Sequence, residues 1–222
     1  VRERPIRVLA LVSNPTDLDA YRLASLDIER ERRALAAACG EVGEGAVHLD
    51  FLDPPVTLER LARALHQSYH VVHYIGHGAF SQKRGQAALL LQGGDGRAQI
   101  VREQELRAMV ARQRHRPELI VLAACQSAQR STVDAFRGLA PQLVQAGVPA
   151  VVAMQAAVSI ITARQFSAAF YRNLLTHGIV DLAANQARSL LLTARRPDAM
   201  MPVLFMRLKD GKLWEMRSEY IS

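Results

Sequence analysis

Short apolar runs, many of them rich in β-branched residues, recur along this 222-residue chain and are separated by segments with helical periodicity. Such runs are typical of strands that are buried on both faces of a sheet. Between them, apolar residues at i, i+3, i+4 and i+7 predict amphipathic helices. Strands that alternate with helices favour a mostly parallel sheet covered on both faces, so the sequence predicts an α/β fold with three layers, α/β/α.

The runs and the residues that bound them give the expected elements. Thr57 is placed to cap a helix, and Gly178 to end one. Gly93 to Gly96 predicts the turn of a small hairpin, because Gly and Asp accept positive φ. We predict strands at 7–12, 47–52, 71–75, 88–92, 98–101, 119–122, 150–154 and 203–207, and helices at 26–38, 58–65, 103–111, 139–145, 161–176 and 182–195.

Length and composition favour one domain over residues 1–222, since half of the residues are hydrophobic and can form a substantial core. The first residue is Val1, so we expect this domain to be part of a longer chain. Only two cysteines occur and no secretory segment opens the sequence, which favours a reducing cytoplasm. The weakly polar stretch 146–163 contains Pro149, Gln155 and Ser159, so a buried strand leading into a helix explains it better than a membrane span.

The net charge of +7 permits binding to nucleic acid or to an acidic partner. The arginines are dispersed over the predicted helices, however, mostly opposite the apolar stripes. We therefore expect a solvated, Arg-rich surface, and a basic nucleic-acid-binding α/β domain stays open as an alternative.

Two of the predicted strands lead directly to a reactive side chain. His77 follows the strand at 71–75, and Cys125 follows the strand at 119–122. In parallel α/β sheets, active groups gather beyond the carboxyl ends of neighbouring strands, so the two residues are expected to meet. Cys125 comes 48 residues after His77, and a His about fifty residues before a nucleophilic Cys is an arrangement found in caspase-like peptidases.

The other candidates have simpler interpretations. Cys39 belongs to the apolar stripe of a helix and is expected in the core. His73 lies inside its strand, which favours a packing or hydrogen-bonding role. The pair His73 and His77 is too widely spaced on a strand for one zinc ion, and no further ligands cluster with it, so we expect no metal.

Several blocks of the sequence, in this order, resemble the CHAT family, a branch of the caspase-like, separase-related cysteine peptidases. The similarity covers nearly the whole chain. The blocks are Arg7 to Pro15, Tyr74 to Gly78, Ala124 to Ser127, Gly147 to Gln155 and Pro202 to Met206.

The resemblance implies a caspase-like fold in which Cys125 is the nucleophile and His77 the general base and acid. It also implies that the backbone amides of Gly78 and Cys125 form the oxyanion hole. No third catalytic carboxylate is evident, and a backbone carbonyl could orient His77.

The expected substrate pocket includes Gln126, Ser127, Gln155 and Ile160, although Gln126 and Ser127 could equally cap the next helix. Many relatives have an acidic residue where this chain has Ile160. If that position contributes to the pocket, an apolar substrate side chain is favoured over Arg or Lys. The same departure is compatible with lost activity.

The resemblance therefore implies a cysteine endopeptidase that cleaves a protein or peptide partner without a metal or cofactor, in regulated bacterial signalling or defence. Relatives are joined to regulatory repeat or sensor modules, so such modules are expected in the parent chain. Two alternatives remain: a catalytically inactive CHAT-like domain that binds a partner, and the nucleic-acid-binding domain named above.

Overall fold

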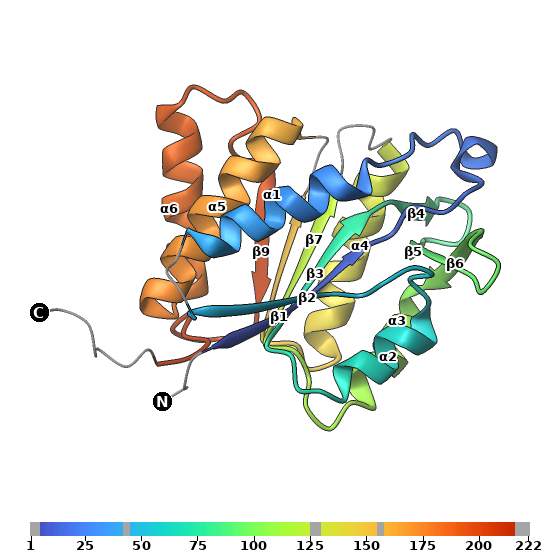
Figure 1. Cartoon of the computed structure of the whole chain (residues 1–222), viewed down its shortest axis with the longest axis horizontal. Helices are drawn as coiled ribbons and strands as arrows, with labels where there is room; N and C mark the ends of the chain where they lie inside the picture. The colour runs from blue at the N-terminus through green and yellow to red at the C-terminus, as the bar shows by residue number, and fades with distance from the viewer. Residues whose placement is uncertain (1–4, 42–44, 125–129, 155–157, 216–222) are drawn as a thin grey trace, which may run out of the picture.

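The computed structural model describes residues 5–41, 45–124, 130–154 and 158–215. Its centre is a six-stranded sheet with the order β2-β1-β3-β7-β8-β9, in which the first five strands are parallel and β9 is antiparallel (Figure 1). The mostly parallel sheet predicted from the apolar runs is confirmed. The strands are β1 (Ile6–Val12), β2 (Val47–Phe51), β3 (Val71–Gly76), β7 (Leu119–Ala124), β8 (Ala150–Met154) and β9 (Pro202–Met206).

Helices cover both faces of this sheet, which makes the three predicted layers (Figure 1). Neighbouring residues of β3 show the two faces. His73 contacts Tyr171 of α5, and Tyr74 contacts Phe136 of α4 in an edge-to-face arrangement. Because both faces are covered, all six residues of β3 are buried. The helices are α1 (Ile28–Gly40), α2 (Leu58–Leu65), α3 (Glu103–Ala111), α4 (Arg130–Gln145), α5 (Ile160–His177) and α6 (Val180–Thr193).

A second, antiparallel sheet packs against α4. It contains the predicted hairpin, β5 (Gln86–Gln92) and β6 (Ala98–Arg102), whose turn uses Gly96 at a φ of 80°. A third strand, β4 (Gly78–Ser81), pairs with β5 and was not predicted. The sequence pattern predicted no strand here, because four residues are too few to show a clear periodicity.

Most helix boundaries follow local signals that the sequence contains. The side chain of Thr57 caps α2 by accepting a hydrogen bond from the Arg60 amide, and Gly178 ends α5 in the left-handed conformation. The prediction for α4 was wrong at its start: the helix begins at Arg130, and Pro141 lies inside it. Proline favours the first turn of a helix, which is why 139–145 was predicted, but here Pro141 lies in the interior and lacks the N–H of that turn.

The loop between β1 and α1 spans residues 13–27 and contains one 3-10 turn, η1 (Leu18–Tyr21). Leu18 and Leu23 of this loop are buried with Leu90 of β5 in a small second apolar cluster. This loop therefore rests on the smaller sheet, beside the end of β3.

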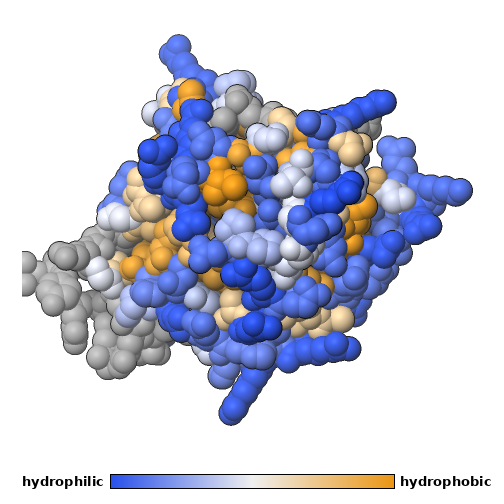
Figure 2. Space-filling view, turned by 45° about the vertical axis from the view of Figure 1, so that its right-hand side comes forward, coloured by the Kyte–Doolittle hydropathy of each residue, from blue (hydrophilic) through white to orange (hydrophobic). Residues whose placement is uncertain are grey.

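The described surface fits the expectation that the arginines are exposed to solvent. Hydrophilic side chains cover much of the face in Figure 2, with apolar areas between them. None of the arginines in the described part of the chain is buried. The described residues form no helix with the length and apolar character needed to cross a membrane, and the stretch 146–163 contains β8 and the start of α5 as predicted.

Candidate active site

The ends of β3 and β7 lie side by side at the centre of the large sheet. The two strands are parallel, and their register pairs Gly76 with Ala124 as the last residues of each. In the sequence, His77 directly follows Gly76 and Cys125 directly follows Ala124. Cys125 itself lies outside the described residues, as do Gln126, Ser127 and Gln155.

His77 is completely buried and makes one hydrogen bond through its ring. Its Nε2 lies 2.9 Å from the backbone carbonyl oxygen of Ala24, in the loop between β1 and α1. A carbonyl oxygen can only accept, so Nε2 carries the hydrogen in this arrangement and Nδ1 is the unprotonated nitrogen. Among the described residues, nothing forms a hydrogen bond with Nδ1. The structure thus holds the imidazole with a buried acceptor available for a proton.

Burial lowers the pKa of His77 below its ordinary value, and the hydrogen bond to Ala24 opposes this only in part. The neutral imidazole is therefore the stable form at pH 7. A neutral imidazole with one nitrogen engaged and the other available is suited to accept a proton from a nucleophile.

Tyr74 fixes the backbone of His77. Its hydroxyl lies 2.8 Å from the carbonyl oxygen of His77 and 3.0 Å from that of Leu90, so its single proton is donated to one of them at a time. The ring of Tyr74 passes over Gly76, where an added Cβ would come within 2.6 Å of the tyrosine Cζ. Gly76 is thus needed for space beneath the tyrosine. Backbone conformation does not require glycine here, since Gly76 does not have a positive φ.

Gly78 begins β4 and lets α4 come close. A Cβ at this position would lie 2.7 Å from the Cβ of Ala135 and 3.2 Å from Cε1 of Phe136. A side chain would therefore push α4 away from the strand that follows His77. The role of the Gly78 amide in an oxyanion hole remains a prediction.

The other candidates occupy the core, as predicted. His73 is 2% exposed, its Nδ1 lies 2.7 Å from the hydroxyl of Tyr171, and burial lowers its pKa to about 3. Cys39 is buried in α1, and burial raises the pKa of its thiol to about 12. Neither group is suited to nucleophilic or acid–base chemistry near neutral pH.

Ile160, a residue of the expected substrate pocket, is the first residue of α5. Ser159 caps this helix, and Asp198 reaches it from the loop between α6 and β9. The carboxylate of Asp198 accepts hydrogen bonds from the amide of Ser159 at 2.7 Å and from the hydroxyl of Thr162 at 2.6 Å. Burial opposes ionisation of Asp198, but these hydrogen bonds outweigh it and hold its pKa below the ordinary value. Asp198 was not predicted, because it lies 38 residues after Ile160 and no local pattern connects the two.

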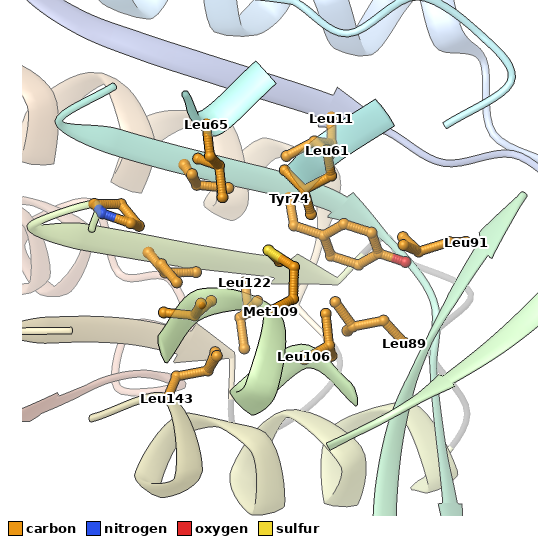
Figure 3. A pocket seen from close by; sticks show the side chains of 14 residues that line it. Leu11, Leu61, Leu65, Tyr74, Leu89, Leu91, Leu106, Met109, Leu122 and Leu143 are labelled. Atoms are coloured by element: carbon orange, nitrogen blue, oxygen red, sulfur yellow. The ribbon is translucent and has the colours of Figure 1, made fainter. Parts of the chain in front are cut away.

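A cavity of about 30 Å³ lies between the sheet and the layer formed by α2 and α3, with Tyr74 in its wall (Figure 3). All of its lining is apolar, and its volume is about that of one water molecule. It is therefore a packing gap and not a substrate pocket. The cavity is lined by Leu11, Leu61, Leu65, Val72, Tyr74, Leu89, Leu91, Leu106, Met109, Val110, Pro117, Ile120, Leu122 and Leu143.

No set of three or more His, Cys, Asp or Glu side chains in the described ranges could hold a metal ion. One ring nitrogen of each of His73 and His77 has a hydrogen-bond partner. Nδ1 of His73 is bonded to Tyr171, and Nε2 of His77 to Ala24.

The family comparison gives one match, to the CHAT domain, over residues 1–218. Comparison with curated protein sequences gives no match.

Solved structures with a similar fold include cysteine peptidases. Gingipain R (RgpB) of Porphyromonas gingivalis, an Arg-specific cysteine proteinase, aligns with a TM-score of 0.55 at 15% identity over 94% of this chain and 47% of its own. The Drosophila initiator caspase Dronc aligns with a TM-score of 0.53 at 11% identity over 90% and 79%. The Saccharomyces cerevisiae separase–securin complex aligns with a TM-score of 0.50 at 17% identity over 92% and 12%.

At identities this low, the alignments show a similar fold and nothing about activity. The fold is the caspase-like fold that the resemblance to the CHAT family implied. The chain spans about half of gingipain R and about an eighth of the separase chain.

Proposed function

Because this chain belongs to the CHAT domain family, we propose that it is a cysteine endopeptidase in which Cys125 is the nucleophile and His77 the general base and acid. The peptidases among its structural neighbours are consistent with this kind of activity. The substrate is a protein or peptide, and the reaction uses no metal or cofactor.

The observation that carries the proposal is the register of β3 and β7. It pairs Gly76 with Ala124 at the ends of the two strands. In the sequence His77 directly follows Gly76 and Cys125 directly follows Ala124, which supports a meeting of their side chains. The tautomer of His77 adds chemical support, because the ring offers an unprotonated Nδ1 with no hydrogen-bond partner in the described part of the chain. A cysteine one residue beyond Ala124 would supply the proton that this nitrogen lacks.

The reaction begins when Nδ1 of His77 takes the proton of the Cys125 thiol. The thiolate attacks the carbonyl carbon of the scissile bond, and the amides of Gly78 and Cys125 donate to the resulting oxyanion. As the C–N bond breaks, the imidazolium returns the proton to the leaving amine. Water then attacks the acyl-enzyme, Nδ1 takes its proton, and the thiol is regenerated as the acid product leaves.

The Ala24 carbonyl supports both halves of this cycle. It keeps the hydrogen on Nε2, which reserves Nδ1 for the proton transfer, and it stabilises the imidazolium while that cation exists. Burial lowers the pKa of His77, so the proton is returned readily. In the resting state the His77 imidazole is therefore neutral at pH 7 and ready to accept the thiol proton.

Ile160 favours a substrate with an apolar side chain before the cleaved bond. An acidic residue at this position would pair with Arg or Lys, and isoleucine cannot. The Gln126, Ser127 and Gln155 side chains complete the proposed pocket. Regulation by attached repeat or sensor modules, in a bacterial signalling or defence pathway, extends the proposal to the parent chain.

Peptide-library profiling of the purified chain, combined with a thiol-directed activity probe, tests this function. The native chain is expected to cleave peptides after apolar residues and to be labelled at Cys125. The variants Cys125→Ala and His77→Ala should lose both properties, while Cys39→Ala, the matched control for the other thiol, should keep them. Labelling and cleavage that survive both Cys125→Ala and His77→Ala would reject the dyad.

Ile160 also favours the second candidate, a CHAT domain that binds a partner without cleaving it. The same profiling separates the two functions. No turnover in the native chain and none in Ile160→Asp would support the binding domain. Turnover after apolar residues in the native chain, changing to Arg or Lys in Ile160→Asp, would exclude it.

A further inference from the structure

The carbonyl that orients His77 belongs to a segment with little packing of its own. Ala24 and Ser25 are exposed, and only Leu26 packs, partly buried, against the main core. Exposed loop segments with few apolar contacts open easily, so their position depends on the hydrogen bonds they make.

Asn14 supplies those hydrogen bonds. Its side-chain Oδ1 accepts from the amide of Leu26 at 2.9 Å, and its Nδ2 donates to the carbonyl of Leu26 at 3.2 Å. Within the described ranges, segment 24–26 is held by hydrogen bonds to two residues only, Asn14 and His77. Asn14 thus joins the beginning of the loop between β1 and α1 to Leu26 near its end. Leu26 lies two residues after Ala24, whose carbonyl accepts the hydrogen bond of the imidazole.

Asn14 is itself fixed to the strands beside His77. Its neighbour Ser13 donates its amide to the carbonyl of Ile75 in β3 at 2.9 Å and its hydroxyl to the carbonyl of Leu90 at 2.8 Å. The buried side chain of Gln92 donates to the carbonyl of Asn14 at 3.3 Å. The side chain of Asn14 therefore ties the segment that contains Ala24 to β3, the strand that directly precedes His77.

We propose that Asn14 is a positioning residue for His77. By holding Leu26, it keeps the Ala24 carbonyl at Nε2 and so maintains the tautomer in which Nδ1 accepts a proton. The inference rests on the proposed function for its catalytic consequence, and on geometry alone for the tautomer. It also gives a role to the Ser-Asn-Pro block at the end of β1.

Asparagine suits this position because it offers one acceptor and one donor side by side, matching the amide and the carbonyl of Leu26. Aspartate has nearly the same shape but no donor, so its second oxygen would face the carbonyl of Leu26. Without the two hydrogen bonds between Asn14 and Leu26, the Ala24 carbonyl is no longer held at Nε2 of His77. The tautomer with hydrogen on Nδ1 then becomes populated, and that nitrogen can no longer accept a proton.

The ring nitrogens of His77 in ¹⁵N-histidine-labelled protein test the proposal directly by NMR, with His77→Gln to assign its signals. The native chain is expected to show a protonated Nε2 and an unprotonated Nδ1. In Asn14→Asp and Asn14→Ser the signals should move toward an exchanging mixture of tautomers. Asn173→Asp makes the same chemical change at a partly buried asparagine of α5 and should leave the His77 signals unchanged.

Kinetics test the catalytic consequence. In the Asn14 variants kcat should fall by up to about 10²-fold, the scale for displaced catalytic groups, with little change in KM. Native His77 signals in both folded Asn14 variants would overturn the proposal. A changed tautomer with unchanged kcat would also overturn the catalytic role. If the native chain has no Cys125-dependent turnover, the proposed function fails, while the NMR result still decides whether Asn14 positions His77.

Discussion

His73 and His77 lie four residues apart, and both are almost completely buried, yet the structure treats them differently. The ring of His73 lies inside β3 beneath α5, where its Nδ1 is bonded to the hydroxyl of Tyr171. The ring of His77 lies just beyond the end of β3, where Nε2 is bonded to Ala24 and Nδ1 has no partner among the described residues. Burial lowers both pKa values, so burial alone does not distinguish the two histidines.

What distinguishes them is the state of the ring nitrogens and their place along the strand. A buried polar atom without a partner is costly and is retained where function needs it. His73 sits in mid-strand, where neighbouring layers cover it. His77 sits where two parallel strands end together, so another chain segment can approach its ring.

Replacing each histidine by glutamine should give the largest difference in kcat/KM between the two positions. Glutamine cannot exchange a proton, so His77→Gln is expected to lower kcat/KM by roughly 10²–10⁴-fold, the contribution of a general base. His73→Gln keeps a hydrogen-bonding group near Tyr171 and should leave kcat/KM unchanged. Steady-state kinetics on a cleaved peptide provide the measurement. Equal losses in the two variants would break the distinction between the two regions.

Crowding the His77 end of the strand should have the next largest effect. The Cβ of Gly78→Ala would meet Ala135, so overpacking is expected to lower the free energy of unfolding by roughly 1–3 kcal/mol. Activity should also fall because α4 and β4 move apart beside His77. Urea denaturation gives the stability.

Gly94→Ala is the control for this change, because a Cβ at Gly94 meets nothing within 4 Å. Its unfolding midpoint should stay close to that of the native chain. If Gly78→Ala proved as stable and as active as Gly94→Ala, α4 would be able to move away from the added Cβ with no loss of stability or activity, contrary to this prediction.

At His73, the hydrogen bond to Tyr171 should matter for stability alone. Tyr171→Phe leaves a buried ring nitrogen unsatisfied, which is expected to cost roughly 1–3 kcal/mol. Because this contact lies in the middle of β3, kcat/KM should be unchanged in the folded variant. Denaturation and kinetics on the same sample test both statements, and a loss of kcat at full stability would contradict them.

Acid should reveal a smaller difference. Both histidines have a lower pKa in the folded chain, so between the folded and unfolded values the unfolded chain binds more protons. Their contribution to stability is complete above pH ~6.5 and is lost as the pH falls below it. For His73 the loss continues to a pH of about 3.

Removing His73 should therefore flatten the acid side of the stability curve. The free energy of unfolding of His73→Gln, measured in urea between pH 7.5 and pH 5, is expected to fall less with acid than that of the native chain. A slope equal to the native one would mean that His73 does not remain neutral in the folded protein.

The inner part of the large sheet could be predicted because strands such as β3 and β8 are buried on both faces and form continuous apolar runs in the sequence. The Leu119–Ala124 strand is the clearest case, and its neighbour β3 follows the same rule. β4 was missed because Gly78–Ser81 is short and its partner β5 comes later in the chain, so no local pattern marks the pairing.

The candidate site could be predicted only in part. His77 could be named as a candidate because it directly follows a buried strand and precedes Cys125 by 48 residues, a sequence separation found in caspase-like peptidases. The Ala24 carbonyl was not identifiable, since every residue has a backbone carbonyl and only the folded loop brings this one to the ring. Asp198 was missed for a similar reason, because its contacts with Ser159 and Thr162 form between distant segments.

The tyrosine ring above Gly76 has an evolutionary consequence. With the Tyr74 ring in its present position, a side chain at position 76 would overlap it, while a smaller residue at 74 would remove both the crowding and the hydroxyl that binds His77. Selection therefore acts on the two positions jointly. In an alignment of relatives, tyrosine at 74 should be accompanied by glycine at 76, and larger residues at 76 should appear only where the aromatic has been replaced.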